Sequence, residues 1–324
     1  MSVYLLETAN TDPTLNLAIE ESLLLKNLPG PALFLWQNAH TVVIGRAQNA
    51  WKECRSELLT QEGGTLVRRS TGGGAVYHDL GNLNFSFVMP KAVYDVTRQL
   101  DVIRQAVSEF GIKTLASGRN DIVLSDTGAK FSGNAFRHAQ ETSLHHGTIL
   151  MDVDMTLLGR YLQPSKLKLE AKGVDSVRAR VGNLKNYNPE ITIEALKDAL
   201  FKAFVNEYGE GERVAWQALL DEAQVRQFQE RYRSWEWTYG KTPRFDLTLE
   251  NRFAFGMVEV QLTLKAGKIE NARCFSDAND PEFAGKVEQA LSGAELTPGA
   301  LRARLLDGGE EMRELGEWLG QQEI

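Results

Sequence analysis

The segment RRSTGGGAVYHDLGNLNFS, from Arg68 to Ser86, joins two arginines to a run of three glycines and a strand-like stretch. A glycine triplet costs backbone entropy and weakens any helix or strand that it interrupts, so close approach to the backbone must be needed there. Successive backbone N–H groups form an anion cradle, and guanidinium groups suit phosphate. A nucleotide-binding turn and a plain glycine-rich β-turn with solvated arginines both fit these residues.

The standard nucleotide-binding and hydrolytic motifs do not explain this segment. The GKT at Gly240 to Thr242 has Trp235 where a Walker loop needs its first glycine. Tyr77 stands where the dinucleotide fingerprint needs its third glycine. The sequence contains neither H-E-x-x-H nor G-x-S-x-G. A glycine-rich turn between two strands is what remains.

A second polar cluster lies in AKFSGNAFR, where Lys130, Ser132 and Asn134 are two residues apart. On a strand this spacing places an ammonium, a hydroxyl and an amide on one face, where they can contact a polar ligand. The alternative is a lysine on an edge strand, where charge prevents unwanted strand pairing. Both interpretations fit the residues.

The segment 160–185 is basic, with seven basic residues against two acidic ones, in a chain whose net charge is −7. Its part KGVDSVRARVGN contains glycines and has no strong helical period, which is typical of a loop. A basic loop in an acidic protein favours a clamp on a polyanion such as ATP, or a docking surface for an acidic partner. A solvated loop with a local excess of charge explains it equally well.

Helices and strands alternate around these motifs. A helix is expected over 12–27, because Asp12 can cap it and Pro13 suits its first position. Residues 83–89 alternate apolar and polar side chains, which predicts a strand with one buried face. We further expect helices at 95–110, 155–162, 192–208 and 219–233, and strands at 32–36, 41–45, 65–70, 143–153 and on both sides of a turn at 125–128.

The character of the chain changes at SWEWTYGKTP, residues 234–243, where an aromatic cluster is followed by glycine and proline. Beyond it, three strand patterns precede three helix patterns, at about 281–291, 298–306 and 310–321. Strands followed by helices indicate a small α+β domain. We therefore expect a large domain over 1–236 and a small one over 245–324.

Composition limits the classes of function. The 324 residues are enough for two domains, and the negative net charge argues against non-specific nucleic-acid binding. Cys54 and Cys274 form no C-x-x-C pair, which fits a reducing cytoplasm. The first residues lack the pattern of a signal peptide, and no apolar run approaches the ~18 residues of a membrane span. A cytoplasmic monomer is the default expectation.

The motifs RRSTGGGAVYHDLGNLNFS, GRNDIV, AKFSGNAFR, HHGTIL and AKGVDSVRARVGNL occur in the order and spacing of lipoate–protein ligase A. FLWQNAHTVVIGRAQNAWKEC and RSWEW are also similar to that family, and the similarity extends over essentially the whole chain. The resemblance implies an α+β protein. Its large domain would have the biotin/lipoate ligase fold, a mixed sheet with flanking helices, followed by the small C-terminal domain of the bacterial two-domain type.

The resemblance also implies a two-step reaction. Lipoate and ATP, with Mg²⁺, would give lipoyl-adenylate and pyrophosphate; a lysine of an apo lipoyl domain would then take the lipoyl group and release AMP. The acceptors implied are acyltransferase subunits of 2-oxoacid dehydrogenases and the glycine-cleavage H protein, in lipoate salvage. Octanoate is often accepted as well.

By resemblance, Lys130 is the catalytic residue, with its ammonium between the lipoyl carbonyl and the phosphate. Asp121 is a candidate Mg²⁺ ligand, or else a residue at a turn or strand end. One of His145 and His146 is expected to face inward and one outward. The remaining residues assigned to ATP and the adenylate are Arg69, Gly74, Ala75, Val76, Tyr77, Asn120, Lys172, Gly173, Val174, Ser176 and Val177. Those assigned to lipoate, beside Lys130 and the two histidines, are Trp36, Val43, Gly45, Ser70, Gly73 and Arg137, of which the first three also fit plain core positions.

Two alternatives remain. An octanoyl- or lipoyl-transferase of the same fold would use a cysteine nucleophile and no ATP. Neither Cys54 nor Cys274 falls where such a nucleophile is expected. A non-catalytic adaptor that binds lipoyl domains would be expected to lack the lysine or the arginines, and this sequence has both.

Overall fold

The computed structural model describes residues 3–118, 121–163, 181–239, 247–265 and 268–322. Its main feature is an eight-stranded sheet in the order β11-β1-β2-β6-β10-β9-β8-β7. Strand β1 pairs in parallel with β2 and β11, whereas the other pairs are antiparallel. The strands are β1 (Val3–Glu7), β2 (Ala32–Trp36), β6 (Asn82–Pro90), β7 (Thr114–Ser117), β8 (Asp121–Leu124), β9 (Lys130–His138), β10 (Thr142–Leu150) and β11 (Gly211–Arg213).

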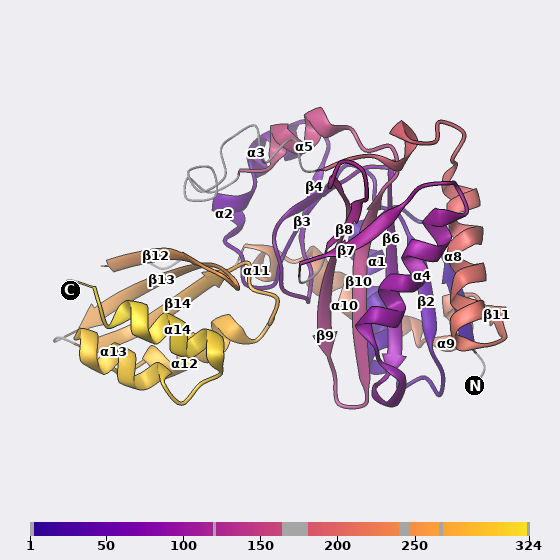
Figure 1. Cartoon of the computed structure of the whole chain (residues 1–324). Helices are drawn as coiled ribbons and strands as arrows, with labels where there is room; N and C mark the ends of the chain where they lie inside the picture. Colours follow the sequence, from indigo (N-terminus) through magenta and orange to yellow (C-terminus); the bar gives the residue numbers. More distant parts are fainter. Residues whose placement is uncertain (1–2, 119–120, 164–180, 240–246, 266–267, 323–324) are drawn as a thin grey trace.

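Helices cover both faces of this sheet (Figure 1). On one face, α4 (Val96–Ser108) and α8 (Ile193–Tyr208) pack over a core that includes Phe85 and Phe87. On the other face lie α1 (Pro13–Leu25) and α10 (Glu222–Arg233). The prediction that the strand at 83–89 has one buried face is therefore wrong, because the strand is central and both its faces are covered.

A separate three-stranded sheet holds the glycine run. Strand β3 (Thr41–Ile44) pairs in parallel with β4 (Thr65–Arg68) and antiparallel with β5 (Val76–His78). The glycines connect β4 to β5, which confirms a glycine-rich turn between two strands. The apolar runs of β2 and β3 are both buried strands as expected, but they belong to different sheets.

Lys130 begins β9, which lies between β8 and β10. The edge-strand explanation of this lysine is therefore wrong. The pairing of β8 with β9 shifts register between Ile122 and Val123, so the pairing is irregular at Lys130, the first residue of β9.

The helices follow their sequence signals closely. Asp12 accepts a hydrogen bond from the backbone of Thr14 and caps α1, as predicted. The helix expected over 219–233 is α10, which begins three residues later because Asp221 caps it, and a short helix, α9 (Trp216–Leu219), precedes it. Further helical segments are α2 (Ala50–Glu53), α3 (Ser56–Gln61), η1 (Lys91–Val93), α5 (Met155–Tyr161), η2 (Leu184–Asn186) and α11 (Trp235–Thr238).

The C-terminal part has its own sheet, β12 (Leu247–Phe253), β13 (Gly256–Lys265) and β14 (Lys268–Ser276), followed by α12 (Phe283–Leu291), α13 (Pro298–Leu305) and α14 (Glu310–Leu319). Its buried residues, from Phe253 to Leu319, form a separate core. In Figure 1 this small domain lies beside the large one. The architecture confirms the expected α+β class with a large and a small domain.

The two domains meet at the glycine run. The backbone N–H of Gly73 donates to Ala278 O at 2.9 Å, and that of Ser276 donates to Ala47 O at 2.7 Å. The segment after β14 therefore touches the turn between β4 and β5. Among the described residues, no helix combines the length and apolar character that a bilayer crossing requires.

Candidate functional site

A cavity of about 150 Å³ lies where the small sheet meets the middle of the large one. Much of the predicted site lines it: Trp36, Val43, Arg69, Gly73, Gly74, Ala75, Val76, Lys130 and His146. The structure thus brings together residues from five separate stretches of sequence.

The three glycines have different roles. A Cβ on Gly72 would lie 2.4 Å from Ala278 O and 2.6 Å from Asn279 O, so the small domain itself requires glycine there. Gly73 has a φ of 87°, which favours glycine over other residues. At Gly74 a Cβ would meet no heavy atom within 4 Å. Only Gly74 therefore leaves free space that a ligand can use.

Arg69 braces the turn from below. Its guanidinium donates to Gly72 O at 2.6 and 3.0 Å, to Gly74 O at 2.8 Å and to Thr71 Oγ1 at 3.0 Å. Burial lowers its pKa to about 10, so the group is still charged at neutral pH. This charge lies beside the turn, whose residues Gly73 to Val76 line the cavity, and it favours an anion on that side of the cavity.

Arg68 also has a structural role. It is buried and donates to the carbonyl oxygens of Gly45, Arg46, Gln48, Trp237 and Thr238. The indole of Trp237 donates back to Arg68 O at 2.9 Å. This clamp, defined by Arg68 and Trp237, fixes the end of the large domain to the loop after β3.

Lys130 also lines the cavity, and unlike Arg69 its cationic side chain is partly exposed. Its Nζ lies 2.6 Å from Asp121 Oδ1, and each side chain is about one-third exposed, at 36% and 35%. A Cβ on Gly133 would lie 2.7 Å from Nζ, so glycine at this position makes room for the ammonium. Gly182 N donates to Lys130 O at 2.9 Å and ties β9 to the described end of the basic segment.

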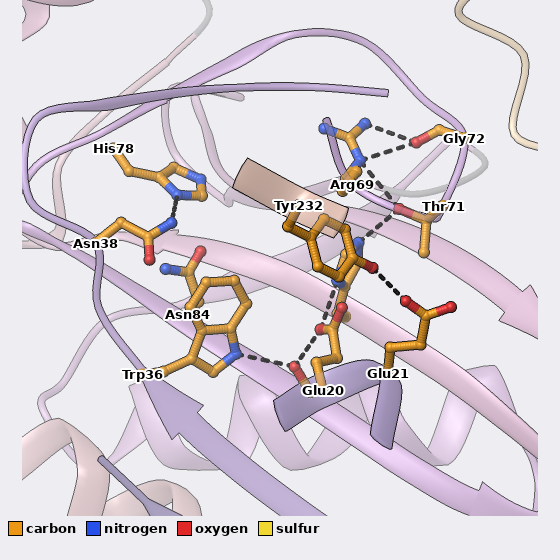
Figure 2. A network of polar contacts seen from close by, with 12 residues as sticks. Glu20, Glu21, Trp36, Asn38, Arg69, Thr71, Gly72, His78, Asn84 and Tyr232 are labelled. Atoms are coloured by element: carbon orange, nitrogen blue, oxygen red, sulfur yellow. Dashed lines mark hydrogen bonds and ion pairs between the residues drawn. The ribbon is translucent and has the colours of Figure 1, made fainter. Parts of the chain in front are cut away.

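A buried polar network continues below the turn (Figure 2). Nε2 of His146 lies 2.8 Å from Thr71 Oγ1, and its Nδ1 lies 2.7 Å from Glu20 Oε1. Ser86 Oγ donates to the same carboxylate oxygen at 2.6 Å, and Trp36 Nε1 donates to Ser86 Oγ at 2.9 Å. The network connects the glycine turn to α1 and fixes the indole that forms a wall of the cavity.

The two histidines of HHG lie on opposite faces of β10, but neither faces solvent. His146 lines the cavity, while His145 lies under α4 between Gln99 Oε1 and Asn134 Oδ1, each at 2.8 Å. Burial lowers the pKa of His145 to about 3. As expected, one histidine faces the cavity and the other faces away from it, but the one that faces away is buried because helices cover both faces of the sheet.

The other predicted residues lie outside the cavity lining. Tyr77 points to the opposite face of β5 and packs against Tyr161 at 5.6 Å between ring centroids. Arg137 pairs with Glu21 on α1 at 2.9 Å. Gly45 lies behind Gly73, where its Cβ would meet Gly73 O at 2.1 Å. Ser70 is buried. The predicted site residues that lie outside the described residues are Asn120, Lys172, Gly173, Val174, Ser176 and Val177.

Asn134, which the sequence placed with Lys130 as a possible contact for a polar ligand, lines the cavity too. Several other lining residues were not predicted: Leu17, His78, Asn84, Gly133, Ala135, Gly147 and Thr148. Asn84 and Ser86 are polar residues within an otherwise apolar strand, and this sequence pattern is typical of a strand that forms a polar pocket wall. His78 carries no such signal, because its place in the cavity depends on how the two sheets meet.

The cysteines lie elsewhere. Cys54 packs with Val42 and Leu59, and burial raises the pKa of its thiol to about 12. Cys274 is buried in the small domain, where burial raises its pKa further. Neither lines the cavity. Among the described residues, no group of three or more histidines, cysteines and carboxylates is placed to hold a metal ion.

Comparison with known families gives two matches. Residues 12–205 match the model of the lipoyl protein ligase A/B catalytic domain. Residues 242–315 match the model of the bacterial lipoate protein ligase C-terminus. These two matches bear out the resemblance that the motifs indicated.

Solved structures give a similar result. The chain is 28% identical to LipL1 of P. falciparum, solved in complex with lipoate, with a TM-score of 0.86 over 99% of this chain and 100% of that one. It is 27% identical to a lipoate-protein ligase A bound with ATP, with a TM-score of 0.61 over 74% of this chain and 98% of that one. A bipartite lipoate protein ligase from Thermoplasma acidophilum, described with its E2 lipoyl domain, is 26% identical, with a TM-score of 0.64 over 76% and 98%.

Proposed function

The chain belongs to the lipoyl protein ligase A/B catalytic-domain family, and from this premise we propose that it is an ATP-dependent, AMP-forming lipoate–protein ligase. In the first step, a lipoate carboxylate oxygen attacks the α-phosphorus of ATP, and the bond to pyrophosphate breaks. In the second, a lysine amine of an acceptor domain attacks the acyl carbon, and AMP leaves. The family match and the similar structures with bound lipoate or ATP support this proposal.

The observation that carries the proposal is the joint lining of one cavity by the glycine turn and Lys130. Carboxylate and triphosphate repel each other, so catalysis depends on positioning them and neutralising their charge. The backbone of Gly74, Ala75 and Val76 supplies an anion-binding edge, while Trp36 and Val43 supply apolar walls for an acyl chain. An acyl carboxylate that projects from those walls would meet the phosphate edge beside Lys130.

Lys130 then stabilises charge in both steps. Its ammonium is a mobile point charge on a long side chain, suited to a phosphate oxygen first and to the developing oxyanion of the acyl carbon next. The 2.6 Å ion pair with Asp121 must open for this to happen. Asp121 thus holds the ammonium in place until a stronger anion arrives.

Mg²⁺ fits this donor set as an ion that arrives with the nucleotide. A protein usually holds such Mg²⁺ through one or two carboxylates plus substrate phosphates, and Asp121 is the carboxylate beside Lys130. When bound, the ion would neutralise phosphate charge. The residues of the chain would still orient the acyl group and place the ammonium.

We propose apo lipoyl domains as acceptors: those of 2-oxoacid dehydrogenase acyltransferases and the glycine-cleavage H protein. One similar protein is described together with its E2 lipoyl domain, which supports this class of partner. We propose a monomer acting in the cytoplasm in lipoate salvage.

An octanoyl- or lipoyl-transferase is the second candidate, because it would share the fold. It needs a thiolate nucleophile at the acyl carbon. Cys54 and Cys274 are buried away from the cavity with raised pKa values, which argues against this chemistry. A non-catalytic adaptor would not need Lys130 and the anion-binding turn in one cavity.

Lipoate-dependent exchange of labelled pyrophosphate into ATP, with Mg²⁺ and without acceptor protein, tests the proposal. Exchange supports reversible adenylate formation. Lipoyl transfer to an apo lipoyl domain without ATP, in the absence of exchange, would instead identify a transferase. Binding of the apo lipoyl domain with neither reaction would identify an adaptor.

A further inference from the structure

Two residues that line the cavity each have a buried nitrogen atom without a hydrogen-bond partner in the described part of the chain: His78 Nε2 and Asn84 Nδ2. Both residues line the cavity, and they are only 3% and 2% exposed. The nearby polar atoms of Glu20 and His146 are, by contrast, hydrogen-bonded. A buried polar atom without a partner is costly, so a pair of them at one cavity needs an explanation.

The neighbours of His78 determine which of its ring nitrogens carries the proton. Asn16 Nδ2 donates to two backbone carbonyls, Asn10 O at 3.1 Å and Gln37 O at 2.9 Å, which fixes the orientation of its amide. The same nitrogen donates to Asn38 Oδ1 at 3.1 Å. Asn38 therefore turns its Nδ2 toward His78 Nδ1, 3.2 Å away. Nδ1 accepts, and the proton of the neutral ring belongs on Nε2.

The ring is also held neutral. Burial, with the nearby charge of Arg69 as a smaller cause, lowers the pKa of His78 to about 3. At neutral pH its Nε2–H is therefore an uncharged donor. Figure 2 shows His78, bonded through its other nitrogen to Asn38, on the same side of the network as Asn84 and Trp36.

Asn84 contributes a second donor. Its Oδ1 accepts from Asn82 Nδ2 at 3.1 Å, which leaves the Nδ2 hydrogens for another partner. The indole N–H of Trp36, its neighbour across β2 and β6, is already used by Ser86. This part of the cavity therefore offers N–H donors and needs an acceptor from whatever fills it.

We propose that His78 and Asn84 determine substrate specificity, selecting an acyl tail with hydrogen-bond acceptor atoms, such as dithiolane ring sulfurs, over an all-methylene chain. This inference rests on the proposed function, since the tail belongs to the acyl substrate of that reaction. A sulfur is a weak acceptor, but a methylene is none, and an octanoyl tail would bury both donors unpaired. Sites built to hydrogen-bond a substrate reject an analogue that lacks the matching group.

The test compares lipoate and octanoate binding by calorimetry in the full-length wild type and in His78→Leu and Asn84→Leu. Each substitution replaces a donor by an apolar side chain. We expect the wild type to bind lipoate more tightly, and the ratio of the two affinities to fall about tenfold in either variant. The ratio should fall for two reasons. Octanoate no longer leaves a buried N–H donor unpaired, and lipoate loses a hydrogen-bond donor.

Two control variants separate hydrogen bonding from shape. His78→Gln keeps an N–H near the position of Nε2 and should retain most of the lipoate preference. Val43→Ala removes apolar contact from both tails alike and should weaken both without changing their ratio. If Val43→Ala changes the ratio as much as His78→Leu does, pocket shape determines the preference and the proposal fails.

Nitrogen NMR of the histidine rings gives a readout independent of affinity. The His78 Nε2–H tautomer should be present in the free protein, and its resonance should move with lipoate but not with octanoate. A proton on Nδ1, equal shifts with both acids, or an unchanged affinity ratio in both leucine variants would overturn the inference.

These outcomes are distinct from failure of the proposed function. Lipoate binding with the expected ratios but no pyrophosphate exchange would refute the ligase and leave the inference intact. Normal exchange with unaltered ratios would do the reverse. A wild type that binds neither acid would refute both.

Discussion

At the scale of single residues, the shape of the cavity depends on a few buried side chains that are hydrogen-bonded to the residues around them. Arg69 holds the turn and His146 links it to Glu20, while Lys130 keeps a partly exposed cation beside them. In the proposed reaction, the buried groups would keep the turn rigid while the ammonium of Lys130 moves between two successive anions.

The first prediction concerns Lys130. Lys130→Ala should lower lipoate-dependent pyrophosphate exchange by at least ~10²-fold, the cost typical of losing one group that stabilises a transition state. The fold should be preserved by circular dichroism, because the side chain is partly exposed. Lys202→Ala, which removes an exposed lysine paired with Glu109 outside the cavity, is the matched control and should retain nearly full activity. Near-normal exchange by Lys130→Ala would contradict the assigned role.

The second prediction concerns the thiols. The double variant Cys54→Ser, Cys274→Ser should keep at least about a tenth of the ligase activity, because a ligase needs no nucleophilic cysteine. Both side chains are buried, so some loss of stability is expected and the assay should be run well below the unfolding temperature. Activity reduced to background in a folded double variant would favour the transferase.

At the scale of elements, α1 and α10 are joined by a buried carboxylate. Glu21 on α1 accepts from Arg137 on β9, from Arg231 and from the Tyr232 hydroxyl on α10. The Glu21 side chain is only 5% exposed. Its contacts fix α10, the helix that precedes the connection between the two domains. Burial alone would raise the pKa of Glu21, but the bonds from Arg137 and Tyr232 outweigh it and the pKa is lowered.

The third prediction follows from that lowered pKa. A carboxylate with a depressed folded-state pKa adds stability above its unfolded pKa of about 4.3, and the contribution is lost as pH falls through the folded pKa. Glu21→Gln should cost about 2 kcal/mol of unfolding free energy at pH 7, discounting for the exposure of Arg231. The variant should also lose less stability than the wild type below pH 4. Urea unfolding at pH 7, 5 and 3.5 measures both effects; parallel pH profiles would contradict the argument.

At the scale of the whole molecule, the small domain touches the glycine turn that lines the cavity. We propose that the division between the domains lies between residues 236 and 245, and that the segment around Ala278 sets how the small domain docks. Its core is separate from the cores of the large domain, so the contact with the turn is a docking contact between two folded units. The turn therefore links the edge of the cavity to the position of the small domain.

The fourth prediction tests this coupling with neighbouring glycines. Gly72→Ala places a Cβ 2.4 Å from Ala278 O and should displace the small domain, changing the radius of gyration measured by X-ray scattering. Gly74→Ala meets no heavy atom within 4 Å and should leave the overall shape unchanged. Equal scattering from Gly72→Ala and the wild type would show that the docking contact is dispensable.

The sequence by itself determined the local elements and the identity of the motifs. The Asp12 cap, the glycine turn between two strands and the order of strands and helices in the C-terminal part all depend on neighbouring residues, which a linear pattern contains. The motif around Lys130 likewise singled this residue out, whereas its place in the cavity and its ion pair with Asp121 are tertiary contacts.

Only the tertiary structure decided which faces are buried and what fills the space around the turn. Helices on both sides of the sheet buried both histidines and both faces of β6, which alternation along one strand cannot reveal. Gly72 is required by a carbonyl about 200 residues away in the sequence, and His78 reaches the cavity through the meeting of two sheets. Burial and close approach are properties of segments distant in sequence, and they exist only once the chain has folded.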